Sequence, residues 1–435
     1  MEFTLLQFTN SLTITFRVDE LSLLFAALTT IMWILVGVYS IDYMKHGEQK
    51  GRFFCFYGIV YVILIGLDFS ANLITLYLFY ELMTLTSTPL ILQELTPESV
   101  KAGFKYLYYS VAGAFLALFG IFVFAQYGSL EFGAGGALDA SVLAEHGTLF
   151  MAAVVCMLIG FGAKAGMFPL HAWLPEAHPV APAPASGVLS GIITKAGVLA
   201  IIRVVFYMVG ADFLRGTGVQ IVWMTLALLT VLMGSMRAYE EKVLKKRLAY
   251  STVSQVSYVL FGLSTLHPVG FVGAMLHMIF HSVAKNLLFL GAGSIMHQTG
   301  KTTVDELKGI GRQMPITIWC FTFAGLSLIG IPPFSGFLSK WYLAEGALNS
   351  RVPGFSWIGP VILLVSALLT AGYLLPVTID GFLPGRKYDG MKLPKCEAGW
   401  KMTVPMMILA ALTLLLGLFP TQLLGILETI AASVM

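Results

Sequence analysis

Long apolar runs separated by short polar segments are the dominant pattern of this chain. A run of about 20 apolar residues is long enough to cross the hydrocarbon core of a membrane as a helix. Twelve segments qualify, at 20–44, 53–68, 71–93, 104–126, 149–170, 185–209, 218–238, 248–266, 268–297, 315–342, 356–383 and 402–434. The runs are continuously apolar, whereas strands of a membrane barrel alternate between apolar and polar positions. The pattern predicts an all-α polytopic membrane protein with about 12 transmembrane helices.

Two of the predicted helices are interrupted by glycine and proline and carry a lysine near the interruption. They read "GFGAKAGMFPLHAWLP" at 160–175 and "GLSLIGIPPFSGFLSKWYLAEG" at 325–346. Five spans separate them, and an odd offset means that they enter the membrane from opposite sides. Paired broken helices of this kind are typical of inverted repeats in transporters. We therefore expect two inverted five-helix repeats, each containing a broken helix.

The whole chain, 1–435, is predicted to be a single membrane domain. Its longest loops have about 20 residues, which is too short for a separately folded domain. The predicted parts are an N-terminal helix at 19–44, a first repeat at 53–209, a second repeat at 218–383 and a C-terminal helix at 402–434. The first 20 residues lack the basic start and long apolar core of a cleaved signal peptide.

Composition and charge agree with a membrane location. Hydrophobic residues make up 57% of the chain and charged residues 11%. One set of alternate loops holds 18 lysines and arginines, and the other set holds three, Arg17, Arg215 and Arg351. The positive-inside rule therefore predicts basic loops in the cytoplasm and both termini on the outer face. The net charge of +3 reflects this topology, so we expect no nucleic-acid partner.

Charged residues inside the predicted spans are the strongest functional signal. Each costs about 2.5–3.5 kcal/mol at the centre of a membrane helix on insertion scales, so such residues are usually functional. The acid near the middle of a span is Glu81, and the bases are Lys164, Lys195, Arg203, Lys285 and Lys340. Glu81 could instead aid helix packing, Lys340 could reach the membrane surface, and Arg203 is expected to be an interfacial anchor. The favoured hypothesis is an ion pathway that begins at a Glu81–Lys164 pair.

Three titratable residues recur every four positions in the ninth span. They are His277, His281 and Lys285, which must share one helical face about 12 Å long. Imidazole titrates near neutrality and passes protons on either nitrogen, so this face could carry a proton wire. Haem ligation is the competing hypothesis, although the residues that could face these histidines, His171 and His178, are predicted to lie in a loop.

The four cysteines do not predict a metal site. Cys55, Cys156, Cys320 and Cys396 lie far apart and form no CxxC or Cys/His ligand pattern. Neither an iron–sulfur nor a zinc signature is present in the sequence. We therefore expect this chain to bind no cofactor and no metal.

Several long motifs resemble those of the antiporter-like subunit family. The family is shared by respiratory complex I, Mrp-type Na+/H+ antiporters and energy-converting membrane-bound [NiFe] hydrogenases. The motifs are "LYLFYELM", "KAGMFPLHAWLPEAHPVAPAPASGVLSGIITKAGV", "KKRLAYSTVSQVSY", "HMIFHSVAKNLLFLGAGSIMH" and "GIPPFSGFLSK". The resemblance extends over almost the whole chain. Family members commonly have fourteen spans, so the first two spans are expected to be absent here, as is the long lateral helix of one complex I subunit.

The resemblance implies roles for the charged residues at mid-membrane. Glu81 corresponds to the family's membrane glutamate, Lys164 to the lysine that pairs with it, and Lys195 to the central lysine of the next helix. The central relay matches His277, His281 and Lys285. At the second broken helix, Lys340 corresponds to the exit-side proton donor, and Gln255 stands where some members have histidine.

These signals lead to a functional hypothesis. The chain is predicted to be a subunit that translocates protons, possibly linked to Na+, within a multisubunit redox-driven ion pump. The expected complex is an energy-converting hydrogenase or a complex I-like enzyme in a prokaryotic cytoplasmic (inner) membrane, with other membrane subunits and a peripheral redox module as partners. The alternatives are an Mrp-type antiporter subunit without a redox partner, a stand-alone transporter, a haem-bearing quinol oxidoreductase subunit and a structural scaffold.

Overall fold

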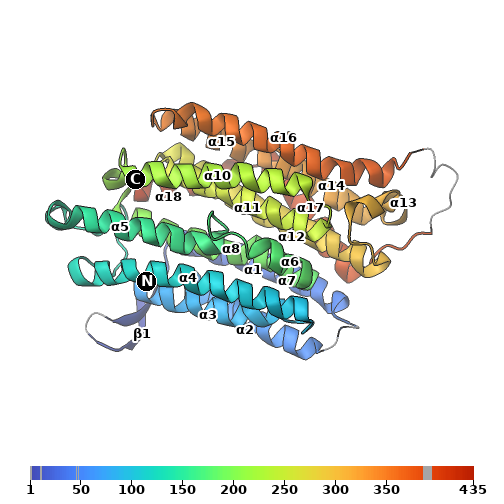
Figure 1. Cartoon of the computed structure of the whole chain (residues 1–435), viewed down its shortest axis with the longest axis horizontal. Coiled ribbons are helices and arrows are strands. Elements are labelled where there is room, and N and C mark those ends of the chain that lie inside the picture. Colours follow the sequence, from blue (N-terminus) through green and yellow to red (C-terminus); the bar gives the residue numbers. More distant parts are fainter. Residues whose placement is uncertain (1, 10–11, 46, 48, 386–393) are drawn as a thin grey trace.

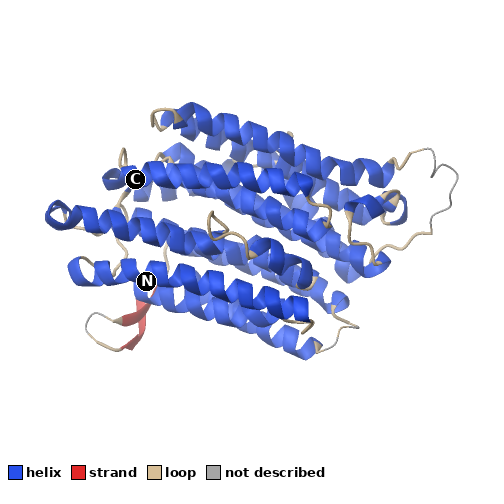
Figure 2. Cartoon of the chain, viewed as in Figure 1, coloured by secondary structure: helices blue, strands red, loops and turns tan. Residues whose placement is uncertain are grey.

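A bundle of long helices makes up the computed structural model (Figures 1 and 2), which describes residues 2–9, 12–45, 47, 49–385 and 394–435. This confirms the prediction of an all-α membrane fold. Part of the predicted basic loop at 384–403, residues 386–393, lies outside the described residues. The N- and C-terminal ends lie at the same end of the bundle, opposite the end that carries α13 (Figure 1).

The first part of the chain contains a short hairpin and the helices up to Leu214. The elements are β1 (Glu2–Gln7), β2 (Thr13–Arg17), α1 (Glu20–Tyr43), α2 (Lys50–Asp68), α3 (Leu73–Ile91), α4 (Pro97–Tyr127), α5 (Ala140–Ala165), α6 (Leu174–Val180), α7 (Ala183–Val188), the π-helical turn η1 (Leu189–Ile193), α8 (Thr194–Ile202), the π-helical turn η2 (Arg203–Val209) and α9 (Ala211–Leu214). The π-turns and α8 continue one long helix.

The second part has the same helical character. Its elements are α10 (Gly218–Glu240), α11 (Leu244–Ser264), α12 (Pro268–Thr299), the 3₁₀ turn η3 (Val304–Leu307), α13 (Ile310–Gln313), α14 (Pro315–Ile329), α15 (Ser335–Asn349), α16 (Phe355–Phe382), α17 (Trp400–Leu418) and α18 (Thr421–Val434). The predicted loop at 237–247 is shorter than expected, because α11 already begins at Leu244.

Nine helical segments of the described chain are long and apolar enough to cross a membrane. Two further helices, α3 and α11, have 19 and 21 residues but carry more polar residues. The predicted tenth span is divided into α14 and α15. The exact number of twelve spans, their inverted repeat relation and the division of the chain into repeats stay predictions.

Both predicted broken helices are interrupted as expected. The first break follows α5, where Gly166 adopts the left-handed conformation (φ 78°), and the second follows α14, where Gly330 does so (φ 91°). Glycine tolerates positive φ because it has no Cβ, and it commonly ends helices in this way.

The C-terminal region differs from the prediction. A single helix at 402–434 was expected, but α17 ends at Leu418 and α18 begins at Thr421. Pro420 lies between them; it has no N–H to donate, and its ring disfavours helical geometry at the preceding residue. Phe419 accordingly leaves the helical region (φ −125°, ψ 61°).

A two-stranded antiparallel hairpin, β1–β2, precedes the first helix and was not predicted. An isolated hairpin is marginally stable in water. Here the second strand is attached to the bundle: the Thr15 N–H donates to Thr75 Oγ1 at 2.9 Å, and the Phe16 ring packs edge-on against Phe79.

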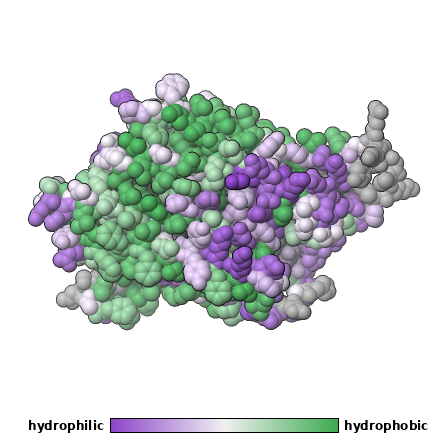
Figure 3. All heavy atoms as spheres, in the orientation of Figure 1, coloured by the Kyte–Doolittle hydropathy of each residue, from purple (hydrophilic) through white to green (hydrophobic). Residues whose placement is uncertain are grey.

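The charged helices lie inside the bundle and the apolar helices surround them. The segments 183–209 and 270–295, which carry the central lysines and histidines, are completely buried, whereas only 28% of the apolar 18-residue window of the 141–165 span is buried. On the face shown in Figure 3, hydrophobic side chains cover much of the surface, and hydrophilic side chains gather toward the end that carries the α13 loops. This inside-out arrangement is expected when lipid surrounds the helices and the function lies within them.

Candidate functional site

Lys164 lies in the last turn of α5, just before the first break, and is fully buried. Its ammonium donates to Thr84 Oγ1 at 2.8 Å, Tyr106 Oη at 2.9 Å and Ser110 Oγ at 2.8 Å. An ammonium has three N–H donors, so these three oxygens satisfy it completely. The cage is therefore built for the charged form of this lysine.

Glu81 lies on α3, one turn before Thr84, and is partly buried. The predicted Glu81–Lys164 pair is not in direct contact in this structure: the two groups are not within salt-bridge distance, and the Glu81 Oε1 atom is buried without a hydrogen-bond partner. The physical reason is that hydroxyl groups already occupy all three donors of Lys164. The two charges are nonetheless close enough to interact electrostatically.

Lys195 lies directly after the π-turn η1, in a helix that is buried on all sides. A π-turn shifts the backbone hydrogen-bond pattern and is frequent at functional sites. The Lys195 Nζ atom donates to the Ser190 carbonyl at 2.7 Å and lies 2.7 Å from His281 Nδ1. This contact joins the first half of the chain to α12.

Two glycines allow the Lys195 helix to approach its neighbours closely. A Cβ on Gly197 would lie 2.5 Å from the Phe161 carbonyl oxygen of α5, and a Cβ on Gly191 would lie 2.2 Å from Asn286 Nδ2 of α12. Small residues of this kind let membrane helices pack backbone to backbone. The helix is thereby held between the Lys164 helix and the histidine helix.

The three predicted residues of α12 share one buried face, as expected from their spacing. The His277 and His281 rings lie 6.3 Å apart between centroids, and Lys285 donates to the Leu248 carbonyl at 3.1 Å. The second nitrogen of His281, Nε2, is buried without a partner. Since the first nitrogen faces Lys195, the free one is available for a proton step.

His277 is fixed on both sides by α11 and α15. Its Nε2 atom lies 3.1 Å from Gln255 Oε1, its Nδ1 atom lies 2.9 Å from Ser339 Oγ, and its ring stacks on Tyr258 with centroids 5.2 Å apart. Haem ligation by His277 would require breaking one of these bonds. The sequence identified Gln255 only through the family resemblance and did not identify Ser339 or Tyr258.

Lys340 lies on α15, just after the second break. Its ammonium donates to the Leu328 carbonyl at 2.7 Å and the Ile329 carbonyl at 3.0 Å, and it lies 5.1 Å from the centre of the Tyr258 ring. These carbonyls are at the C-terminal end of α14, where a cation is favoured by the helix dipole. The Tyr258 ring therefore contacts both Lys340 and His277.

The predicted residues lie in one row inside the bundle, with Glu81 and Lys340 partly buried and the lysines and histidines between them fully buried, and direct contacts join only some neighbours in this row. Direct contacts link Lys195 to His281 and connect His277 through Tyr258 to Lys340, whereas Lys164 and Lys195 are linked only through the close packing of α5 and α8. Sequence reasoning missed the hydroxyl cage of Lys164. Tyr106 and Ser110 are four residues apart in "YLYYS", so their hydroxyl groups lie on one face of a helix, and this spacing could have indicated a polar partner for a buried charge.

His178 is a second correction. A loop position was expected, but it lies in α6, fully buried and stacked on Phe289 with ring centroids 4.7 Å apart. Both ring nitrogens lack a hydrogen-bond partner.

Nearby, Lys245 of the predicted basic loop is also buried and donates to the Pro179 carbonyl at 3.2 Å. The three adjacent basic residues of the "KKR" motif predicted an exposed loop, and nothing in the neighbouring sequence indicated that Lys245 would be buried in α11.

Arg203 was expected to be an interfacial anchor but is 1% exposed and ion-paired. Its Nη1 and Nη2 atoms contact Asp19 Oδ2 at 2.7 Å and Oδ1 at 3.0 Å. Burial of Asp19, just before α1, raises the pKa of its carboxyl, but hydrogen bonds and charge from Arg203, with hydrogen bonds from Ser22, lower that pKa overall. The pair joins residues 184 positions apart and connects the N-terminal segment to η2.

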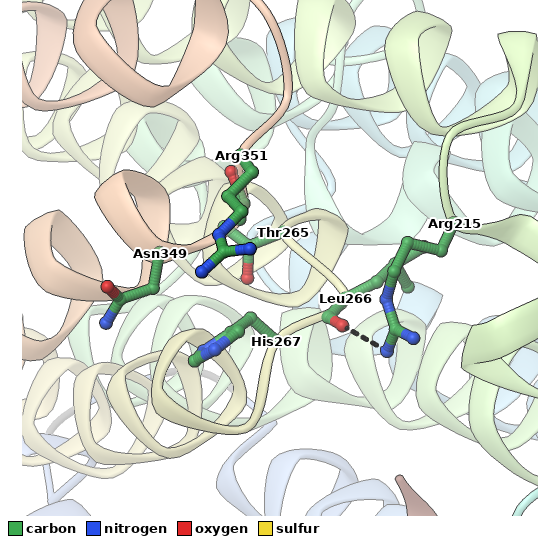
Figure 4. Close-up of a pocket in the computed structure, with 7 residues that line it drawn as sticks. Arg215, Thr265, Leu266, His267, Asn349 and Arg351 are labelled. Carbon is green, nitrogen blue, oxygen red and sulfur yellow. Dashed lines mark hydrogen bonds between the residues drawn. The ribbon is translucent and has the colours of Figure 1, made fainter.

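Two of the surface pockets outside the buried row are lined by charged side chains. One, of about 300 Å³, is lined by Arg215, His267 and Arg351 (Figure 4), with Arg215 donating to the Leu266 carbonyl at 2.9 Å. The other, of about 430 Å³, is lined by Tyr43 and Glu94 among others. Within the part of the chain that the structure describes, no three His, Cys, Asp or Glu side chains form a possible metal site.

Comparison with known families matches most of the chain. Residues 70–370 match the model described as "NADH:quinone oxidoreductase/Mrp antiporter, TM", and residues 6–54 match "NADH-Ubiquinone oxidoreductase (complex I), chain 5 N-terminus".

Curated relatives come from three kinds of complex. The chain is 32% identical to NADH-quinone oxidoreductase subunit N of Desulforudis audaxviator, over 89% of this chain and 78% of the relative. It is 30% identical to hydrogenase-4 component B of Escherichia coli, over 93% of this chain but only 62% of the relative. It is also 30% identical to an Na(+)/H(+) antiporter subunit of Bacillus subtilis, over 92% of this chain and 79% of the relative.

Solved structures have the same fold. A chain of the Mrp complex from Dietzia sp. DQ12-45-1b superposes with a TM-score of 0.86 at 22% identity, covering 100% of this chain and 87% of that one. A chain of the archaeal membrane-bound sulfane sulfur reductase gives a TM-score of 0.83 at 26% identity, covering 98% and 69%. The relatives and both structures are parts of multisubunit membrane complexes.

Proposed function

Because the chain belongs to the NADH:quinone oxidoreductase/Mrp antiporter family of membrane subunits, we propose that it translocates protons through its buried row of lysines and histidines. The single observation that carries this proposal is the Lys195–His281 contact at 2.7 Å, which joins two fully buried titratable groups from different helices. A buried base in a membrane helix is costly and is seldom present without a role in transport.

The residues have distinct roles in the proposed pathway. Lys164 holds a proton in its hydroxyl cage, Lys195 receives it across the close α5–α8 contact, and His281 and His277 pass it toward Lys340, which releases it. Lys285 lies on the same face of α12 as the two histidines, one turn beyond His281, and supplies a further basic group there. No redox cofactor is assigned to this chain.

Movement of Glu81 is the proposed switch. At an effective dielectric of about 20, two opposite unit charges attract by about 2 kcal/mol at about 8 Å and by about 4 kcal/mol at about 4 Å, a distance that Glu81 and Lys164 would reach only by moving closer than they are here. A shift of a few ångströms therefore changes the free energy of charged Lys164 by about 2 kcal/mol, or about thirtyfold in proton occupancy. Redox energy from a peripheral module would move the carboxylate, and Na+ could replace a proton in the linked step.

The proposed setting is a redox-driven pump of the energy-converting hydrogenase or complex I-like type in a prokaryotic cytoplasmic membrane. The basic loops would face the cytoplasm and both termini the outside. Active alkaline phosphatase fused to the C-terminus would support this orientation, and an inactive fusion in a stably expressed protein would contradict it.

A second candidate is an Mrp-type antiporter subunit without a redox partner. Similarity to the Na(+)/H(+) antiporter subunit of Bacillus subtilis over most of both chains favours it. Purifying the native complex through a tag on this chain would decide between the two. Co-purified subunits with flavin or iron–sulfur absorption support the pump, whereas a colourless complex with Na+-dependent proton exchange supports the antiporter.

The proton pathway is tested with the intact complex in liposomes. Lys195→Met and Glu81→Gln should abolish proton translocation, while Lys101→Met, the same change at an exposed lysine, should not affect it. If both buried variants translocate protons at the normal rate, the proposed function is wrong.

A further inference from the structure

Ser339 is a fully buried hydroxyl at the contact between the second broken helix and the histidine pair. It lies on α15, directly before Lys340. Its Oγ atom is 2.9 Å from His277 Nδ1 and 3.1 Å from the Gly336 carbonyl oxygen. A serine hydroxyl has one proton, whereas a carbonyl oxygen can only accept. Ser339 can therefore donate to only one of these two partners at a time.

The orientation of the Gln255 amide determines whether the other ring nitrogen of His277, Nε2, carries a hydrogen. Thr370 Oγ1 donates its single proton to the Ser366 carbonyl at 2.7 Å, so it must accept from the Gln255 Nε2 atom 3.4 Å away. The amide nitrogen of Gln255 thus faces Thr370, and its oxygen faces His277 Nε2. Because that oxygen only accepts, His277 Nε2 must carry a hydrogen.

These two constraints leave one nitrogen of His277 for proton exchange. Nε2 keeps its hydrogen in the bond to Gln255, and an amide oxygen cannot pass an excess proton onward. Protons must therefore arrive and leave at Nδ1, where Ser339 lies. We propose that the Ser339 hydroxyl is the two-position partner that lets His277 gain and lose its proton, which makes Ser339 a positioning residue for the transport step.

The two positions correspond to two charge states of His277. When His277 is neutral, Ser339 donates to Nδ1. When one proton binds Nδ1, the Ser339 hydrogen turns to the Gly336 carbonyl, and Ser339 Oγ accepts from the new Nδ1–H. When the proton leaves Nδ1 again, on its way along the row to the neutral amine of Lys340, the Ser339 hydrogen turns back to the free Nδ1 lone pair. Ser339 keeps its own hydrogen throughout, so it satisfies Nδ1 in both charge states and does not itself carry the proton.

Other groups around His277 do not replace Ser339. The titratable and charged groups that face it are His281, Tyr258, Lys195 and Lys340. None of them is within hydrogen-bond distance of Nδ1. Without the serine hydroxyl, a buried Nδ1–H of a charged imidazole would have no acceptor, and an unsatisfied charged group is especially costly.

This inference rests on the proposed proton pathway and is tested in the same intact complex in liposomes. Ser339→Ala should lower proton translocation about tenfold, and Ser339→Thr, which keeps the hydroxyl, should restore most of it. Ser335→Ala is the matched control. Ser335 is also buried on α15, but its hydroxyl pairs with Ser327 at 3.0 Å, away from His277.

A solvent isotope effect separates a role in proton transfer from a role in folding. In Ser339→Ala the rate should fall more strongly in D2O than in the wild type, because transfer at His277 becomes limiting. A variant that only reduces the amount of complex would lower the rate in H2O and the rate in D2O by the same factor, so its isotope effect would equal that of the wild type. If Ser339→Ala fails to assemble, Ser339→Cys takes its place, since a thiol of similar shape is a weak donor and acceptor.

The possible results have different consequences. Translocation by Ser339→Ala within about twofold of wild type, while Lys195→Met abolishes it, overturns the role of Ser339 and leaves the pathway intact. Equal impairment of the alanine and threonine variants also overturns it, because the hydroxyl would not be the determining group. Normal translocation by Lys195→Met would instead reject the pathway itself.

Discussion

The buried ion pair between Asp19 and Arg203 gives a quantitative test of how the N-terminal segment is attached to the bundle. Removing one partner of a buried pair typically costs about 3–5 kcal/mol, because the other charge is left uncompensated. Arg203 is 1% exposed, and its guanidinium also packs against Tyr207 at 4.5 Å, so it has little access to water. Because the Asp19 side chain is 23% exposed, Asp19→Asn should destabilise the protein by about 3 kcal/mol, the lower end of this range.

Two variants separate the charge from the helix cap. Asp19 also caps α1 by accepting the Ser22 N–H at 2.7 Å. Asparagine keeps this cap, whereas Asp19→Ala removes it and should cost about 1 kcal/mol more. The matched control is Asp212→Asn, which removes an exposed partner of Arg215, with the Asp212 side chain 82% exposed. Exposed pairs contribute about 0–1 kcal/mol, so this control should change little.

The assay is thermal unfolding of the purified complex in detergent, followed by tryptophan fluorescence at several pH values. Because the folded-state pKa of Asp19 is lowered, its stabilisation is fully present above the ordinary value of 3.8 and disappears as pH falls through the lower folded value. The difference between wild type and Asp19→Asn should shrink in that acidic range. Equal effects of Asp19→Asn and Asp212→Asn at neutral pH would refute the reasoning.

Two further predictions concern Lys164 and its helix. Tyr106→Phe removes one of the three acceptors of the Lys164 ammonium and should slow proton translocation about tenfold. The rate is measured from the acidification of liposomes with a pH-sensitive dye. An unchanged rate would show that the hydroxyl cage is not needed. Gly113→Ala would place a Cβ 2.5 Å from the Gly160 carbonyl oxygen and should lower the melting temperature by several degrees, whereas Gly58→Ala, with no neighbour within 4 Å, should not lower it.

Much of the architecture could be predicted because the membrane imposes it on the sequence. A helix in lipid must satisfy its backbone internally and present apolar side chains outward, so a run such as 20–44 is recognisable without its neighbours. A buried charge is equally visible, because Lys195 has no charged residue near it in the chain to explain its presence. The four-residue spacing of His277, His281 and Lys285 places them on one helical face, because a helix turns once every 3.6 residues or so.

The partners of these charges could not be predicted from spacing. Lys164 is caged by residues 54 to 80 positions away, and Arg203 pairs with a residue 184 positions away. A hydrogen bond forms wherever packing brings donor and acceptor together, and nothing in the local sequence records that distance. The same holds for His178, whose burial depends on how α6 packs against α12.

The sequence by itself determined that this is a helical membrane protein with two broken helices and a row of buried bases. These features follow from hydrophobicity, glycine and proline geometry and the cost of charge in lipid, which act locally along the chain. Only the tertiary structure decided that Lys164 is held by hydroxyls and not by Glu81, that Lys195 contacts His281, and that Ser339 faces His277. Those contacts depend on helix crossings, which arise from the packing of the whole bundle.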